Sequence, residues 1–172
     1  MAKRKTAELA KGISYWSFPG GMENRADVIS VLSRARQVGF TSVELGISDT
    51  GVLTLDTTRS ECRALARAGE AAGVGISALA TNLYWASNLA AARAAERSRA
   101  VEMTKRMIEK ASWLAADALV VIPGWVRSLF NPKAETVPYE EALARARESL
   151  RKCIKTAEKH KVTLAILNAW SG

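Results

Sequence analysis

The stretch VPYEEALARARESLRKCIKTAEKHKVTLAILNAW, residues 137–170, contains the pattern that decides the fold. In its first part, apolar residues recur at helical spacing: Leu143, Leu150, Ile154 and Ala157. Pro138 fits the first turn of this helix, where its missing N–H is no loss. The continuously apolar run TLAIL, residues 163–167, follows directly. Such a run is typical of a strand covered on both faces, as in a parallel sheet.

The same helix-to-strand unit recurs toward the N-terminus. Four more runs are predicted to be strands: Ile13–Trp16, Ser42–Ile47, Ile76–Ala80 and Ala118–Pro123. Thr58 and Glu61 have the spacing of a capping box, and Gly39 and Gly73 follow the expected ends of two helices. Strands joined by helical crossovers run parallel. We therefore expect an α/β domain with five parallel strands and four helices.

This domain is expected to take up residues 1–172, with residues 1–10 as a flexible basic tail. Two architectures fit the order of elements. One is a five-stranded open, doubly wound sheet, and the other is part of a (β/α)8 TIM barrel. A complete barrel typically needs about 250 residues. Length alone therefore favours the open sheet.

Composition narrows the class of protein. No apolar run approaches the roughly 20 residues of a membrane-spanning helix, and the N-terminus lacks the apolar centre of a signal peptide. The net charge of +8 comes from Lys and Arg scattered beside Glu, so no nucleic acid is expected as a partner. Cys62 and Cys153 lack metal-site spacing and are expected to be reduced, half-buried packing residues. We predict a soluble cytoplasmic protein without a membrane partner.

Specific residues then favour the barrel. From about Lys11 to Trp170 the chain resembles the sugar phosphate isomerase/epimerase family, which has the xylose-isomerase-like barrel. The ordered segments that carry this resemblance are KGISYWSFPGG, GFTSVELGI, ALATNLYWASNL, ALVVIPGWV and the stretch quoted above. The resemblance implies a partial TIM barrel that represents only the N-terminal portion of such an enzyme.

The resemblance also implies an activity. Enzymes of this family interconvert sugars or sugar phosphates by moving a proton between adjacent carbons through an enediolate. They use a divalent metal (Mn, Mg, Co or Zn), held by acidic and His or Gln side chains at the ends of the last four strands. Two glutamates act as acid and base, and the first lies on the fifth strand in a motif similar to L-A-I-E-N-x-W-N.

In this chain the matching residues are Leu164–Ser171, and Leu167 stands at the position of that glutamate. A leucine can neither coordinate a hard cation nor carry a proton. The three strands that would hold the other ligands are absent from the sequence. We therefore expect no catalytic residue, no metal ligand and no cofactor, and a truncated chain that is inactive alone.

Few other residues could replace this chemistry. Glu44 is the only carboxylate well placed on a strand, while Asp49 and Asp56 lie in the following loop. Glu44 is interpreted either as a hydroxyl-binding residue or as a strand carboxylate satisfied by a neighbour or by water. His160, the only histidine, is expected on the surface in the last turn of its helix. Arg127 could meet an anionic substrate, but a solvated loop arginine is the simpler interpretation.

Aromatic residues recur at or just after the strand ends, where they could stack on a sugar or simply fill the barrel mouth. Asn168 could donate hydrogen bonds to hydroxyls. Tyr84 belongs to this ring of aromatics. The candidate substrate-binding residues, for a sugar ligand, are Tyr15, Trp16, Glu44, Trp85, Trp125, Asn168 and Trp170.

A partial barrel has two unpaired edges, at its first and last strands, and exposes apolar surface beside them. We expect self-association into a homo-oligomer, or another partner, to cover these edges. The alternative to an incomplete enzyme is therefore a non-catalytic, oligomerising or sugar-binding half-barrel module.

Overall fold

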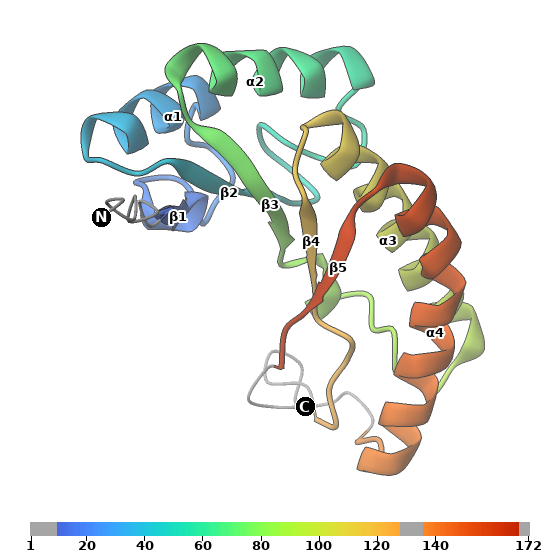
Figure 1. Cartoon of the computed structure of the whole chain (residues 1–172). Coiled ribbons are helices and arrows are strands. Elements are labelled where there is room, and N and C mark those ends of the chain that lie inside the picture. Colours follow the sequence, from blue (N-terminus) through green and yellow to red (C-terminus); the bar gives the residue numbers. More distant parts are fainter. Residues whose placement is uncertain (1–9, 128–135, 169–172) are drawn as a thin grey trace, which may run out of the picture.

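The computed structural model describes residues 10–127 and 136–168 of the chain (Figure 1). The expected tail at residues 1–10 therefore lies almost entirely outside the described residues. All strand pairs are parallel, and each strand lies beside the next in sequence. The strands are β1 (Gly12–Ser14), β2 (Ser42–Ile47), β3 (Gly75–Thr81), β4 (Ala118–Val121) and β5 (Thr163–Ile166). A doubly wound sheet reverses its strand order at a switch point, so this order confirms the partial barrel.

Four helices connect the strands: α1 (Val28–Gln37), α2 (Arg59–Ala72), α3 (Ala94–Trp113) and α4 (Tyr139–His160). They lie along the outer, convex side of the curved sheet, and none of these four helices covers the concave side (Figure 1). Two short 3-10 helices, η1 (Tyr15–Ser17) and η2 (Leu83–Trp85), follow the ends of β1 and β3. Among the described residues, no helix is both long and apolar enough to cross a membrane.

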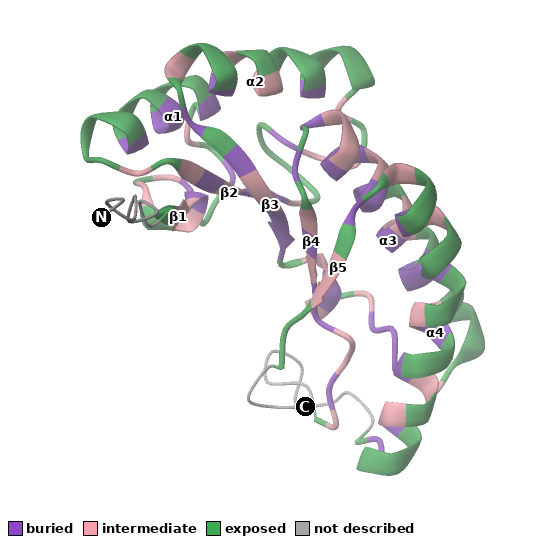
Figure 2. Cartoon of the chain, in the orientation of Figure 1, coloured by how far each residue is buried: buried purple, intermediate pink, exposed green. Residues whose placement is uncertain are grey.

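Side chains alternate between the two faces of the sheet. Leu45, Leu79 and Leu119 are paired neighbours on β2, β3 and β4, and all three are buried in the core that the helices cover. Figure 2 shows buried residues along the strands and on the sides of the helices that face them. Glu44 and Ala78, which also pair, must therefore point to the opposite side. We call this concave side the inner face, because it would line the interior of a closed barrel.

The expected helix boundaries are largely confirmed. Thr58 and Glu61 form the predicted capping box, and Gly73 ends α2 in the left-handed conformation with φ +68°. Pro138 is the exception, because it precedes α4 as its N-cap with ψ 140° and does not lie in the first turn. Both cysteines are free, and they are fully buried rather than half-buried as expected.

The first predicted strand was too long at its C-terminal end. β1 ends at Ser14, and the next residues turn into η1. The Ser14 hydroxyl accepts a hydrogen bond from the amide of Trp16 at 3.4 Å and so caps this turn. β4 likewise ends at Val121 rather than at Pro123.

The buried face of α4 also differs from the predicted one. The residues that α4 buries are Ala142, Ala146, Ser149, Cys153 and Ala157. Of the predicted stripe, only Ala157 is buried; Leu143 and Leu150 are half-buried and Ile154 is exposed. Small side chains let α4 pack closely on α3, where the sulfur of Cys153 lies 4.0 Å from the carbonyl oxygen of Val101. The larger residues are left on the flank of the helix.

Candidate functional site

The inner face and the carboxyl ends of the strands contain most of the predicted site residues, because parallel strands bring these ends to one edge of the sheet. Trp16 lies against the inner face of β2, since a Cβ built on Gly46 would be 2.8 Å from its indole Nε1. Only a glycine at position 46 leaves room for this contact. Trp16 itself is half-buried. It is thus an aromatic surface at the barrel mouth.

Tyr15 is placed differently from its neighbour. Its side chain is only 1% exposed, and its hydroxyl donates to the carbonyl oxygen of Ala26 at 2.6 Å. Burial raises the pKa of the Tyr15 phenol. The hydroxyl therefore links η1 to the segment that enters α1. This packing contact explains the position of Tyr15, and no bound ligand is needed to explain it.

A second aromatic cluster follows β3 and β4. The rings of Trp85 and Trp125 stack with centroids 5.6 Å apart and planes 25° apart. Trp125 is buried and Trp85 is half-buried. Tyr84 is fully buried, its hydroxyl lies 2.9 Å from Oγ1 of Thr104, and burial raises its pKa. Tyr84 therefore anchors η2, and Trp85 remains accessible beside Trp125.

The acidic residues do not converge. Glu44 is half-buried on the inner face, and its side chain makes no hydrogen bond or ion pair within the described part of the chain. Asp49 is exposed next to Ser48, whose hydroxyl lies 3.0 Å from the Asp49 carboxylate and 3.2 Å from Oδ1 of Asn82. Asp56 points away and pairs with Arg106 at 2.9 Å. The three acids therefore do not act as one site.

The divalent metal that the resemblance implies does not fit these residues. Within residues 10–127 and 136–168, no three His, Cys, Asp or Glu side chains are grouped so that they could hold a metal ion. His160 lies in the last turn of α4, as predicted, but its side chain is only 18% exposed. Its Nε2 lies 4.0 Å from Oε1 of Glu109 on α3, so the histidine is partly covered at the surface of its helix.

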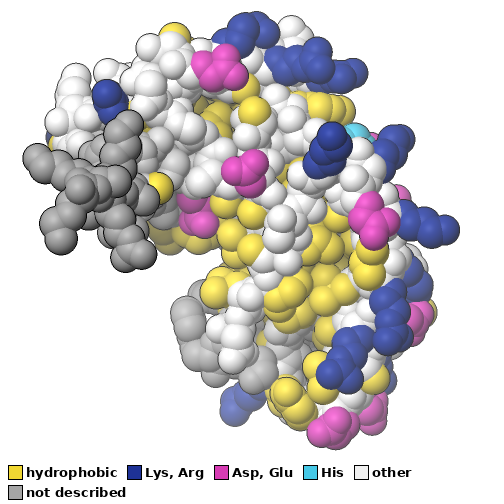
Figure 3. Space-filling view, viewed as in Figure 1, with side chains coloured by type: hydrophobic (Ala, Val, Ile, Leu, Met, Phe, Trp, Pro, Cys, Tyr) yellow, Lys and Arg dark blue, Asp and Glu magenta, His cyan; other side chains and the backbone are white. Residues whose placement is uncertain are grey.

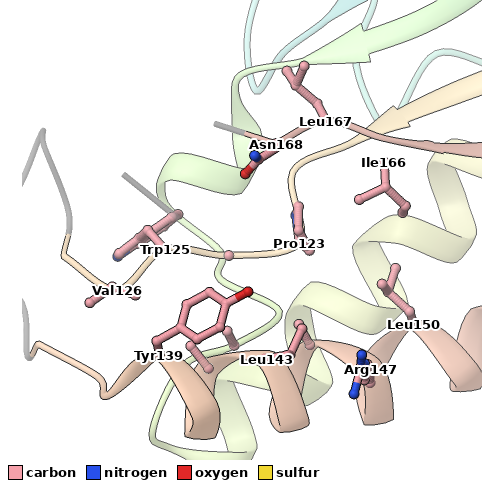
Figure 4. A pocket seen from close by; sticks show the side chains of 14 residues that line it. Pro123, Trp125, Val126, Tyr139, Leu143, Arg147, Leu150, Ile166, Leu167 and Asn168 are labelled. Atoms are coloured by element: carbon pink, nitrogen blue, oxygen red, sulfur yellow. The ribbon is translucent and has the colours of Figure 1, made fainter. Parts of the chain in front are cut away.

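Leu167 directly follows β5 and continues its pairing, because its amide donates to the carbonyl oxygen of Val121 at 2.9 Å. Figure 4 shows Leu167 and Ile166 pointing in opposite directions, with Ile166 turned toward Leu150 of α4. Alternation from Ile166, which faces the helices, places Leu167 on the inner-face side. Leu167 is 48% exposed. An apolar side chain therefore stands at the carboxyl end of β5, where the resemblance implies a glutamate.

A groove between α4 and β5 was not predicted from the sequence. Its volume is about 290 Å³. Figure 4 shows the side chains that line it. Apolar residues dominate its lining, which includes Tyr139, Leu143, Leu150 and Ile166, with Arg147 and Asn168 as polar residues. The spacing of Tyr139, Leu143, Leu150 and Ile154 was the signal available in the sequence, since it is a second apolar stripe on α4.

Two other candidates lie at the margin of the site. Asn168 is exposed and lines the α4–β5 groove rather than the cluster around Trp16. Arg127 is exposed and makes no ion pair among the described residues. Trp170 lies outside the described residues. Sugar binding by the remaining candidates stays a prediction.

Comparison with known proteins gives a consistent result. A family model described as xylose isomerase-like TIM barrel matches residues 32–171. No curated protein sequence matches the chain. Similar solved structures include a D-psicose 3-epimerase in the presence of D-fructose, with a TM-score of 0.74 and 15% identity over 95% of this chain. An L-ribulose 3-epimerase has a TM-score of 0.70 and 22% identity over 92% of this chain.

A sugar phosphate isomerase/epimerase from Parabacteroides distasonis is also similar, with a TM-score of 0.63 and 16% identity over 96% of this chain. At these identities the likeness shows a shared fold. The chain covers 54%, 49% and 53% of these three structures, respectively. It thus spans about half the length of the structures that it matches.

Proposed function

The chain belongs to the xylose isomerase-like TIM barrel family, and from this membership we propose that it forms the first five strands of a sugar or sugar-phosphate isomerase/epimerase barrel without turnover of its own. The similar structures named as sugar epimerases support the class of reaction. They share the fold, while the residues of this chain decide what chemistry it can perform.

The observation that carries the proposal is Leu167 on the inner-face side at the end of β5. Epimerisation next to a carbonyl requires a base that removes a proton from carbon and a group that stabilises the enediolate. Leu167 can do neither. Glu44 is a carboxylate on the inner face, and one carboxylate cannot serve as base, acid and metal ligand together. The missing groups would have to come from outside residues 10–127 and 136–168.

A sugar-binding role is compatible with the same residues. Trp16 offers an aromatic face at the barrel mouth, with Glu44 on the same inner face as an acceptor for hydroxyl groups. Trp85, stacked on Trp125, is a second aromatic candidate. Tyr15 contributes least, because its hydroxyl is already bound to the Ala26 carbonyl. We infer that a retained ligand would be a sugar held at Trp16 and Glu44.

A second candidate function is a non-catalytic, oligomerising or sugar-binding half-barrel module. The two open sheet edges at β1 and β5 and the apolar α4–β5 groove favour it, because such surfaces bind other chains. The buried free thiols of Cys62 and Cys153 suit a reducing compartment, so we propose the cytoplasm as its location.

The test uses the purified 172-residue chain. D-Fructose, D-tagatose and L-ribulose are incubated with it in the presence of Mn²⁺ or Co²⁺, and the products are separated by chromatography. We expect no epimer above the protein-free control. Tryptophan fluorescence titration with the same sugars then measures binding, with Trp16→Leu and Glu44→Gln as variants. Turnover that is lost in Glu44→Gln would contradict the proposal. Sugar binding without turnover would favour the binding module.

A further inference from the structure

The outer face of β5 is incompletely covered. Val121 and Ile166 are paired neighbours on β4 and β5, so their side chains point to the same, helix-facing side of the sheet. Val121 is fully buried, whereas Ile166 is 52% exposed. The difference arises because α3 and α4 cover β4, while no described helix lies on the far flank of β5. A neighbouring helix would bury Ile166 as Val121 is buried.

Helix α4 has a second stripe that faces the same space. Its buried residues pack against α3 and the sheet. About a quarter turn away lies a row that we call the flank stripe, and it consists of Tyr139, Leu143, Arg147, Leu150 and Ile154. Residues three and four apart share one face of a helix. In Figure 3 hydrophobic side chains gather between the strands and α4 on this side of the molecule. The flank stripe and Ile166 thus border one continuous apolar surface.

The backbone of β5 is also open on this side. The amide of Thr163 donates to the carbonyl oxygen of Asp117, the residue before β4, at 2.8 Å, and the amide of Leu167 donates to that of Val121 on β4 at 2.9 Å. Because backbone groups alternate in direction along a strand, those of Leu164 and Ile166 point away from β4. Their N–H and C=O groups are therefore placed to pair with a further strand. The sheet can continue at the place where the groove lies open.

Arg147 gives this apolar surface a positive charge. It is exposed in the middle of the flank stripe and makes no ion pair within the described segments. The ion pairs of α4 lie elsewhere: Arg145 with Glu141 at 2.6 Å and Lys152 with Glu148 at 2.7 Å. A cation surrounded by apolar residues favours a partner that brings a carboxylate to it.

From these observations we propose that the α4–β5 groove binds an amphipathic helix that lies alongside α4, packs apolar residues on Leu150 and Ile166, and pairs a carboxylate with Arg147. This helix belongs to a polypeptide that supplies the barrel units beyond β5. The inference rests on the proposed function only in treating the sheet as part of a barrel. The similar structures support this source, because about half of each extends beyond the match to this chain.

A second copy of the chain is a poorer occupant. Two copies that met through the same stripe would bring their Arg147 side chains together near the centre of the contact. A copy that added its β1 to β5 would supply a strand, but no described helix precedes β1, so the groove would stay open. Two copies would also bring ten strands, whereas a TIM barrel closes with eight.

The test measures binding of a labelled, hydrocarbon-stapled peptide helix of about 16 residues to the full chain by fluorescence anisotropy. Two versions of this peptide are compared. The acidic peptide has leucines in one helical row with a single Glu among them, and the basic peptide has Lys in place of that Glu. We expect saturable binding of the acidic peptide with a Kd of about 10–100 µM. Arg147→Glu should weaken this binding about fivefold or more and should make the chain prefer the basic peptide.

Lys155→Glu is the matched control, because Lys155 is an exposed cation on the solvent side of the same helix. It should leave both affinities unchanged. Absence of saturable binding by the folded wild-type chain, or equal effects of the two charge reversals, would overturn the proposal. Sedimentation analysis that shows a dimer lost on mutation of Leu150 to Lys would assign the groove to a second copy instead. The turnover assay is independent, so failure of one proposal leaves the other standing.

Discussion

A mutant cycle at Tyr84 and Thr104 tests how the aromatic cluster is anchored. The two hydroxyl oxygens are 2.9 Å apart and buried. Thr104 also donates to the carbonyl oxygen of Ala100 at 2.8 Å. A hydroxyl has one proton to give, so the Tyr84 hydroxyl must be the donor to Thr104. A tyrosine hydroxyl is protonated at neutral pH, and burial raises the pKa of Tyr84 further.

The direction of this hydrogen bond predicts that removing the donor and removing the acceptor lower the free energy of unfolding by different amounts. Thr104→Val leaves the Tyr84 O–H buried without an acceptor, which should lower the free energy of unfolding by about 2 kcal/mol. Tyr84→Phe removes the donor, while Thr104 keeps its bond to Ala100, so we expect a loss of about 1 kcal/mol. The double variant has no unpaired hydroxyl. It should be more stable than Thr104→Val alone, with a coupling energy of about 1 kcal/mol.

Urea unfolding at pH 7, followed by circular dichroism and tryptophan fluorescence, measures the free energy of unfolding of the wild type, the two single variants and the double variant. The fluorescence also reports whether the stack of Trp85 on Trp125 survives, since Tyr84 and Trp85 share η2. A cost of Tyr84→Phe that equals or exceeds that of Thr104→Val would refute the assigned donor. Strictly additive costs would refute the claim that the two hydroxyls form one buried unit.

Two further predictions concern backbone and charge. Gly124→Ala should cost more than about 2 kcal/mol in urea unfolding, because at φ +151° its Cβ would lie 2.5 Å from Cβ of Ala90. Gly39→Ala has open space at φ +90° and should cost only about 1 kcal/mol, so equal costs would contradict this reasoning. Lys110 donates to the carbonyl of Thr57 at 2.7 Å, and burial lowers its pKa. The unfolded chain therefore holds the Lys110 proton more tightly than the folded chain does. The stability of the wild type relative to Lys110→Met should increase as the pH rises from the lowered pKa to about 10.4. This gain should be lost as the pH falls through the lowered pKa. Urea unfolding at pH 7 and pH 10 checks this, and a difference independent of pH would count against it.

The strands and their parallel direction could be predicted because each strand is a short apolar run separated from the next by a helical crossover. Their order could not be predicted from these runs, because both an open doubly wound sheet and a partial barrel fit them, and only the family resemblance favoured the barrel. The buried side of α4 could not be predicted either. Periodicity marks Leu143, Leu150 and Ile154 as one apolar row, but it does not say which of two adjacent rows faces the core. The close approach of α3 and α4 selects the row of small residues, such as Ala142 and Ala146. That choice depends on the distance between two helices, which no local pattern contains.

The sequence alone also could not tell which of two adjacent aromatic residues at the site is buried. Tyr15 and Trp16 follow the end of one strand, as Tyr84 and Trp85 follow another, so the sequence treats them as equivalent pairs. Each pair lies in a 3-10 turn, where successive side chains point about 120° apart. In each pair the tyrosine therefore enters the core, and the tryptophan beside it remains half-buried. The candidates separate only once these turns are known.

Leu167 raises the question of whether its surroundings require an apolar side chain. It is 48% exposed, so only about half of its surface is removed from water. Burying half of a leucine contributes roughly 1 kcal/mol, and a glutamate could keep much of that contact with its methylene groups while its carboxylate remained in water. The amide bond to Val121 involves only the backbone and would persist. Packing within the described residues therefore does not impose leucine at this position, and its presence is a difference in chemistry rather than a demand of the fold.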